Sequence, residues 1–240
     1  MCKALTVDSI LPYVLLGMTA VTGLVDAVSF LSLGHVFTAN MTGNIVLLAF
    51  ASTGPSQVSV AGSITALLSF LAGAAVGGRI MAGASAALQL RAASSVFGLE
   101  IVFLVGATLA ALGYSLVSSS QFLRLYAMIA FTAIAMGMRN AAVRKLAIPD
   151  LTTTVLTLTI TGLAADSSLA RGTNPRLQRR IAAVVAMFAG AVFGSVTLKH
   201  SVFMALAFSV VLSSLCSLAL LISSRLPRAR NAEKGLGVAS

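Results

Sequence analysis

The stretch FTANMTGNIVLL, residues 37 to 48, resembles part of a membrane segment but carries three polar side chains close together. Asn40, Thr42 and Asn44 would each cost about 1 to 3 kcal/mol if they were buried without a hydrogen-bond partner. The apolar segment around them, about 36 to 51, covers roughly 23 Å as a helix, which is less than the hydrocarbon core of about 30 Å. These features predict a short helix that enters the membrane without crossing it, and whose polar side chains bind unpaired backbone groups or a solute.

The composition is that of an integral membrane protein. Of the 240 residues, 58% are hydrophobic and 9% are charged, and the mean hydropathy is +1.00, whereas about a quarter of the residues in soluble domains are charged. The excess of 16 basic over 6 acidic residues fits basic cytoplasmic loops, so we expect no nucleic-acid partner. Six apolar runs predict full spans, and a second short segment, 151–165, reads LTTTVLTLTITGLAA; the six runs are about 10–33, 58–81, 95–117, 122–138, 181–198 and 202–222.

The distribution of Lys and Arg tests whether the two short segments cross the membrane. If all eight segments cross, ten basic residues share one side and six the other, whereas fourteen are cytoplasmic and two are not if neither short segment crosses. If only the first short segment crosses, the division is thirteen to three. The positive-inside rule rejects the first arrangement and leaves the other two open. We expect an all-α bundle of six spans plus two short or re-entrant helices, with the termini and the basic tail, 223–240, in the cytoplasm.

Two motifs occur twice in the same order. GLVDA at 23–27 corresponds to GMRNA at 137–141, and AGAAVG at 72–77 corresponds to AGAVFG at 189–194. They predict two repeats, about 10–117 and 122–222, within a single membrane domain, 1–240. Three full spans per repeat would give the repeats opposite orientations, while chance matching of small residues is the alternative. The paired glycines of the second motif predict close packing of helices.

Inverted repeats with short helices are typical of secondary transporters, whose solute site lies near the bilayer midplane. Asp26 is the sharpest single candidate, because an acid within a span costs at least about 2.5 kcal/mol on insertion scales. Glu100 is a weaker candidate, and reaching the cytoplasmic interface is its preferred interpretation. Arg139, Arg144 and Lys145 could attract an anionic solute, but we interpret them as residues that fix topology. Structural hydrogen bonding between helices is the alternative role for the polar residues. The candidate solute-binding residues are Asp26, Thr38, Asn40, Thr42, Asn44, Asn140, Thr154 and Thr157.

The sequence contains few residues or motifs typical of an enzyme, a cofactor site or a metal site. It contains only two histidines, His35 and His200, and no HExxH or GxSxG motif. We therefore predict that the chain is not an enzyme and holds neither a cofactor nor a metal. The preferred hypothesis is a secondary transporter of a small metabolite, with lipid and the solute as partners, and with proton coupling and homo-oligomer formation left open. The alternative is a non-transporting membrane scaffold or receptor-like protein.

The chain resembles the YoaK-like family of bacterial integral membrane proteins, whose function is unknown and whose members are often labelled small-molecule metabolite transporters. The resemblance rests on GLVDAVSFLSLGHVFTANMTGNIVLLA at 23–49, and extends through LAGAAVGG and GMRNAAVRKL to LTTTVLTLT, over about 12–222. It implies a multi-pass protein of the bacterial cytoplasmic membrane. Many relatives carry Thr-Gly where this chain has Thr157-Leu158.

Overall fold

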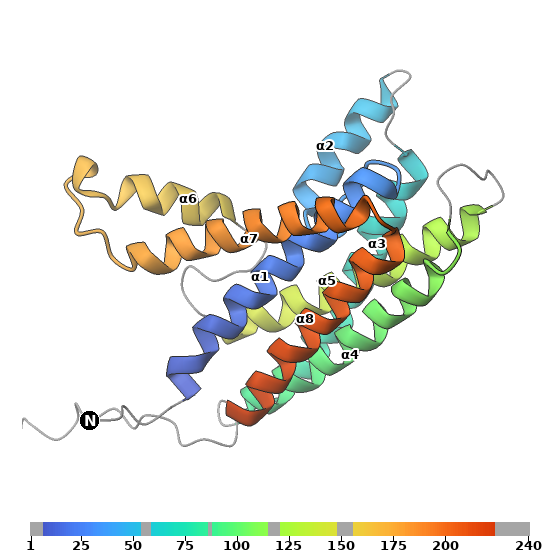
Figure 1. The fold of residues 1–240 in the computed structure, drawn as a ribbon. Coiled ribbons are helices and arrows are strands. Elements are labelled where there is room, and N and C mark those ends of the chain that lie inside the picture. Colours follow the sequence, from blue (N-terminus) through green and yellow to red (C-terminus); the bar gives the residue numbers. More distant parts are fainter. Residues whose placement is uncertain (1–6, 54–58, 86–87, 115–120, 148–155, 224–240) are drawn as a thin grey trace, which may run out of the picture.

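The computed structural model describes residues 7–53, 59–85, 88–114, 121–147 and 156–223, with side chains from Ile10 onward. Every regular element within these ranges is helical (Figure 1). The predicted tail lies outside the described residues from 224 onward. The elements are α1 (Val7–Ser32), α2 (Met41–Ser52), α3 (Val60–Ala82), α4 (Gln89–Ala110), α5 (Phe122–Leu146), α6 (Leu156–Ala165), the short 3₁₀ helix η2 (Ser168–Ala170), α7 (Leu177–Leu198) and α8 (Val202–Ser223).

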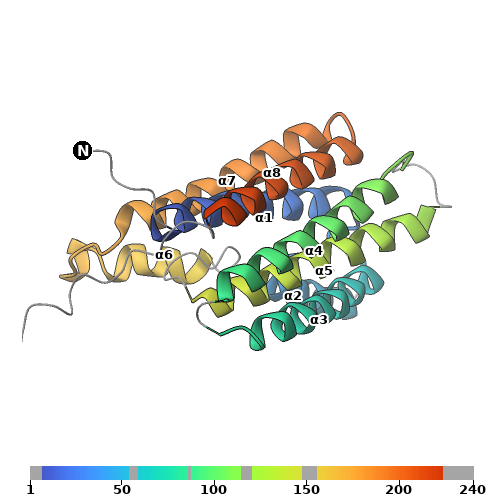
Figure 2. The same cartoon turned by 90° about the horizontal axis from the view of Figure 1, so that it is seen from below.

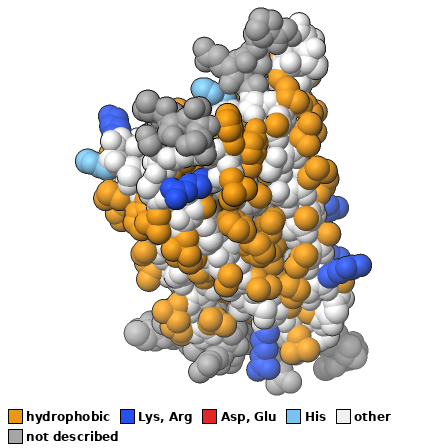
Figure 3. Space-filling view, turned by 90° about the vertical axis from the view of Figure 1, so that its right-hand side faces the viewer, with side chains coloured by type: hydrophobic (Ala, Val, Ile, Leu, Met, Phe, Trp, Pro, Cys, Tyr) orange, Lys and Arg blue, Asp and Glu red, His pale blue; other side chains and the backbone are white. Residues whose placement is uncertain are grey.

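Six of these helices are long and apolar enough to cross a membrane, namely α1, α3, α4, α5, α7 and α8. The other two α-helices, α2 and α6, have 12 and 10 residues, so each is shorter than the hydrocarbon core is thick. Hydrophobic side chains predominate on the face in Figure 3, and no acidic side chain is visible there. The predicted all-α bundle of six spans and two short helices is confirmed.

The directions of α1 and α3 show how the chain passes through α2. One hydrophobic cluster contains Leu11 from the start of α1 and Met81 from the end of α3. A second cluster contains Val28 from the end of α1 and Ala66 from the start of α3. The two helices therefore run in opposite directions, and the chain between them leaves and returns at the same end of the bundle. The short helix α2 does not cross.

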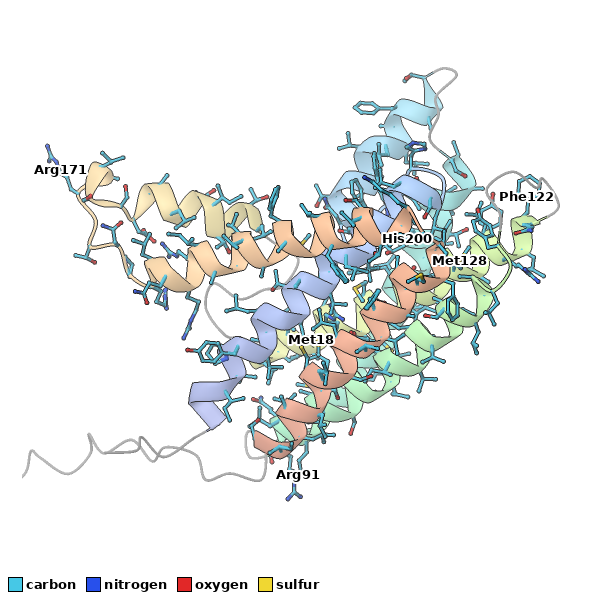
Figure 4. All side chains as sticks on the ribbon, in the orientation of Figure 1. Met18, Arg91, Phe122, Met128, Arg171 and His200 are labelled. Atoms are coloured by element: carbon cyan, nitrogen blue, oxygen red, sulfur yellow. The ribbon has the colours of Figure 1, made fainter. Side chains whose placement is uncertain are left out.

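The same test applies to α6. Helix α5 passes from the second cluster at Met128 to the first at Met138, whereas α7 passes from the first at Ala183 to the second, against which Leu198 packs. Since α5 and α7 run in opposite directions, α6 also returns to the end from which the chain came. Figure 4 labels Arg91 at this end of the bundle, and Phe122 and His200 at the other. Of the three charge arrangements, only the one in which neither short segment crosses agrees with these directions.

The helices pack most closely at two glycine-lined crossings. Where α1 crosses α7, a Cβ atom added at Gly23 would collide with the carbonyl oxygen of Met187, and one added at Gly190 would collide with that of Ala20. Such contact lets the two backbones approach directly. Gly190 belongs to the AGAVFG motif, so the close helix packing predicted from that motif is confirmed at this crossing.

The α3–α5 crossing is built in the same way. A Cβ atom at Gly73 would collide with the carbonyl oxygen of Ile134, and one at Gly137 with that of Phe70. Figure 2 shows α1, α7 and α8 together on one side of the bundle, α2 and α3 on the other, and α4 and α5 between them. Each crossing thus joins a helix from one half of the sequence to a helix from the other half.

We predict that Gly137→Ala and Gly190→Ala lower the free energy of unfolding by about 1 to 3 kcal/mol, because the added methyl group overpacks a backbone contact. Gly78→Ala is the matched control, since a Cβ atom there meets nothing within 4 Å and alanine favours a helix. Thermal unfolding of the purified protein in detergent measures the effect. Equal melting temperatures for all three variants would contradict the close crossings.

We predict that cysteines at Thr53 and Leu112 react with an impermeant thiol reagent in intact cells, whereas cysteines at Gly83 and Ser168 react only after permeabilisation. The first two positions lie at the end of the bundle that carries few basic residues, and the other two at the basic end, which the positive-inside rule assigns to the cytoplasm. Cys2 and Cys216 are first replaced by alanine. Labelling at Thr53 that needs permeabilisation would mean that α2 crosses.

Candidate functional site

The segment between α1 and α2 folds back over the end of α1 and is held there by Asp26. Oδ1 of Asp26 accepts hydrogen bonds from the backbone N–H groups of Thr38, at 3.2 Å, and Ala39, at 2.9 Å. Two consecutive N–H groups that precede α2 therefore converge on one buried acid, which satisfies donors that water cannot reach.

Two asparagines then start the short helix. Oδ1 of Asn40 accepts from the N–H of Gly43, at 3.3 Å, and so caps α2. Asn44 is fully buried and binds both polar groups of one backbone position: Oδ1 accepts from the N–H of Phe37, at 2.8 Å, and Nδ2 donates to the carbonyl of Phe37. The prediction that polar side chains satisfy backbone groups at this short helix is confirmed for Asn40 and Asn44.

A pocket of about 430 Å³ lies where the N-terminal ends of α2 and α6 approach each other, and we call it the α2–α6 pocket. Thr42 and Thr157 contribute hydroxyl groups from the two helices, and Asn40 contributes an amide; all three residues are exposed. The pocket is lined by Phe37, Asn40, Thr42, Gly43, Val46, Leu47 and Thr157. None of these residues is ionisable.

The structure divides the predicted site residues into groups. Asn40, Thr42 and Thr157 line the pocket, whereas Asp26, Thr38 and Asn44 are buried behind its wall. Phe37 is a lining residue that the sequence analysis did not single out. The only feature of the sequence that could have identified Phe37 is its position next to the polar residues from Thr38 to Asn44.

Asn140 and Thr154 are the remaining candidates. Asn140 is half-buried on α5, and its Nδ2 donates to the carbonyl of Met136 in the same helix, at 2.9 Å. It does not line the pocket. Thr154 lies outside the described residues.

A buried ion pair that the sequence analysis missed lies at the centre of the bundle. Arg139 and Glu100 are both fully buried, and the guanidinium binds the carboxylate through two groups: Nε donates to Oε2, at 3.0 Å, and Nη2 donates to Oε1. Nη1 donates to the carbonyl of Met18, at 2.8 Å, and to Oγ1 of Thr22, at 3.2 Å. Nη2 also donates to Oγ of Ser213, at 3.1 Å. All five guanidinium N–H donors can thus be satisfied.

Two interpretations from the sequence are therefore wrong. Glu100 does not reach the cytoplasmic interface, and Arg139 is not a surface residue that fixes topology. The predicted span ended at 138, but α5 continues to Leu146, so Arg139 lies inside the helix. Arg139 and Glu100 join α5 to α4, and the other partners of Arg139 lie on α1 and α8. The network therefore links helices from both halves of the chain.

A second arginine anchors the far end of α6. Arg180 on α7 is buried; its Nη1 donates to the carbonyl of Gly162, at 2.6 Å, and its Nη2 lies 2.8 Å from Oδ2 of Asp166. The carbonyl of Gly162 also accepts from the N–H of Asp166, at 3.2 Å, so Arg180 adds a second hydrogen bond near the C-terminal end of α6, where a cation interacts favourably with the helix dipole. The end of α6 opposite the pocket is thereby fixed to α7.

We predict that Arg139→Met destabilises the protein by about 3 to 5 kcal/mol, because it leaves the Glu100 carboxylate buried without a partner. The double variant Arg139→Met with Glu100→Gln should recover much of this loss, since no net charge then remains at the site. Unfolding of the purified variants in detergent measures both values. Additive losses in the double variant would contradict a direct energetic coupling between the two residues.

Comparisons with known proteins agree with this architecture. The chain is 39% identical over 154 residues to the UPF0700 transmembrane protein YoaK of Bacillus subtilis (strain 168), and the match covers 64% of this chain and 65% of that protein. No solved structure matches the chain. The family model described as "Protein of unknown function (DUF1275)" matches residues 14–219. With that match over most of its length and six helices fit to span a membrane, the chain belongs to the DUF1275 family and is a multi-pass membrane protein.

Proposed function

We propose that the protein is a secondary transporter of a small metabolite and that the α2–α6 pocket is its solute site. The observation that carries this proposal is the meeting of two short helices, distant in sequence, at one pocket with polar groups from both. Secondary transporters typically bind their solute where such interrupted helices end within the membrane. The pocket volume of about 430 Å³ lies within the range of small-molecule sites.

The lining suggests the kind of solute. Two threonine hydroxyls and one asparagine amide can exchange hydrogen bonds with a polar group, while Phe37 and Val46 offer apolar contact. No ionisable side chain lines the pocket. A small solute with a hydroxyl, amide or carbonyl group and an apolar portion fits these surroundings best.

Two features support an inverted-repeat architecture. Gly23 and Gly137, which occupy matching places in the duplicated first motif, each contact a backbone carbonyl across a helix crossing. The helix directions are opposite as well, since α1 ends at the cluster from which α5 starts. Alternating exposure of a shared site is the usual function of such a pair of repeats. We further propose that the protein lies in the bacterial cytoplasmic membrane, as its transmembrane relative from Bacillus suggests.

We expect that Thr42→Val and Thr157→Val each weaken solute binding several-fold, because each removes one hydrogen bond worth about 0.5 to 1.5 kcal/mol. Thr161→Val is the matched control: Thr161 is also exposed on α6, but its hydroxyl donates to the carbonyl of Thr157 and does not line the pocket. A thermal-shift screen against a metabolite library identifies the solute. Binding to the variants and uptake into proteoliposomes then test the site.

Solvent access separates transport from the scaffold or receptor-like alternative. Cysteines at Thr42 and Thr157 should react with small thiol reagents, and a solute found in the screen should slow that reaction. If both cysteines are unreactive from either side of the membrane, the pocket is closed to water and the scaffold function is favoured.

A further inference from the structure

Asp26 occupies an unusual position for an acid in a membrane-spanning helix. It lies six residues before the end of α1 and is 6% exposed. No described basic side chain forms an ion pair with it; the ion pairs found in the described part of the chain join Arg139 to Glu100 and Arg180 to Asp166. A lone carboxylate at this depth is costly, and such residues commonly mark ion pathways.

The groups around Asp26 leave its charge without a compensating cation. Helix α7 contacts this part of α1 through Met187 and Ala191, which are apolar. The ionisable groups on the other elements packed against α1 are few or already engaged. Those that contact α1 or the segment after it are the Arg139–Glu100 pair, which reaches α1 at Thr22, one turn before Asp26; Cys216 on α8, which faces Gly17; and His35 after α1, whose ring packs on Phe30. Lys199, at the end of α7, is exposed and forms no ion pair with Asp26.

Thr38 offers an oxygen ligand beside this carboxylate. Its N–H donates to Oδ1 of Asp26, yet its own Oγ1 is fully buried and has no hydrogen-bond partner. Among the described residues, the hydroxyl of Ser63 on α3 is also buried without a partner, whereas those of Thr19 and Ser32 on α1 donate to a carbonyl of their own helix. A buried polar atom without a partner usually indicates a water molecule or an ion at that place.

We propose that Asp26 and the Thr38 hydroxyl bind a monovalent cation, H⁺ or Na⁺, and that this cation controls the α2–α6 pocket. Carboxylate and hydroxyl oxygens suit both ions, and the ion would supply the missing positive charge. This inference rests on the proposed transport function and adds its coupling ion. It assigns Asp26 a positioning role, since the carboxylate does not line the pocket.

The connection between the ion and the pocket is the segment from Thr38 to Asn40. An ionised Asp26 holds its N–H groups by charge-assisted hydrogen bonds, which are roughly twice as strong as neutral ones. A bound cation neutralises the carboxylate and weakens this hold on the residues that lead directly to Asn40 in the pocket wall. Occupancy by the cation therefore changes how firmly that wall is held.

Asn140 occupies the matching place in the duplicated motif, 114 residues after Asp26. An amide there can neither release a proton nor present a negative charge to Na⁺. The matching place in the second half therefore does not form a cation site of this kind.

The absence of tryptophan from the chain allows a direct test with Phe37→Trp, which places a single fluorophore next to Thr38. Purified full-length protein is titrated from pH 8 to pH 5 without Na⁺, and with NaCl against choline chloride at pH 8. We expect a saturable fluorescence change in one titration, which identifies the ion, and its loss when Asp26→Asn is added. Phe188→Trp, on an exposed face of α7, should not respond.

Persistence of the same titration in the Asp26→Asn background, or no response of Phe37→Trp to either ion, would overturn the proposal. If Asp26→Asn does not fold, Thr38→Val is decisive in its place: loss of the hydroxyl ligand should shift the midpoint about tenfold in cation concentration, and an unchanged midpoint refutes the site. The titration needs no solute, so it succeeds or fails independently of thiol access to the pocket, which tests the transport function.

Discussion

The bilayer offers no water to a helix that ends inside it, and the structure at α2 follows from this constraint. The backbone groups before and at the start of α2 are satisfied by three side chains: Asp26 receives the N–H groups that precede the helix, Asn40 caps its first turn, and Asn44 binds the peptide groups of Phe37. Each side chain replaces water at a defined place. Thr42, in the first turn of α2, lines the pocket.

The two halves of the chain must also be held together, although the short helix of each half packs against few other elements. Glycine crossings provide close backbone contact between α1 and α7 and between α3 and α5. The Arg139–Glu100 network adds a polar connection at the centre, where Met18 and Ser213 also take part. Replacement of a buried ion pair by apolar residues is often neutral or stabilising, so this network is best understood as fixing which helices meet.

Much of this architecture could be predicted from local sequence. Hydrophobic length identified six spans, and the polar residues within a short apolar segment identified α2 as a helix that needs internal partners. Local signals could not identify the pairing of Glu100 with Arg139, because those residues are 39 positions apart. The predicted span also ended at 138, one residue before Arg139, whereas α5 continues to Leu146. Nor could they separate the roles of Asn40 and Asn44, which depend on how the chain folds back after Leu33. That Thr42 and Thr157 line the same pocket could be learned only from the three-dimensional structure.

The two proposed repeats have similar helix arrangements, but one carries an acid where the other carries an amide. In the first half, the carboxylate of Asp26 faces the N–H groups that lead into α2, so it opposes the partial positive charge at the start of that helix. In the second half, the matching residue is Asn140, whose amide carries no charge. The two helices that meet at the pocket therefore contribute similar shapes and similar hydroxyl groups but different electrostatic surroundings. An ion that neutralises Asp26 would alter only the α2 side of the pocket. A site between two nearly equivalent halves can favour one conformation of the protein over the other only if the halves differ, and the charge of Asp26 is such a difference.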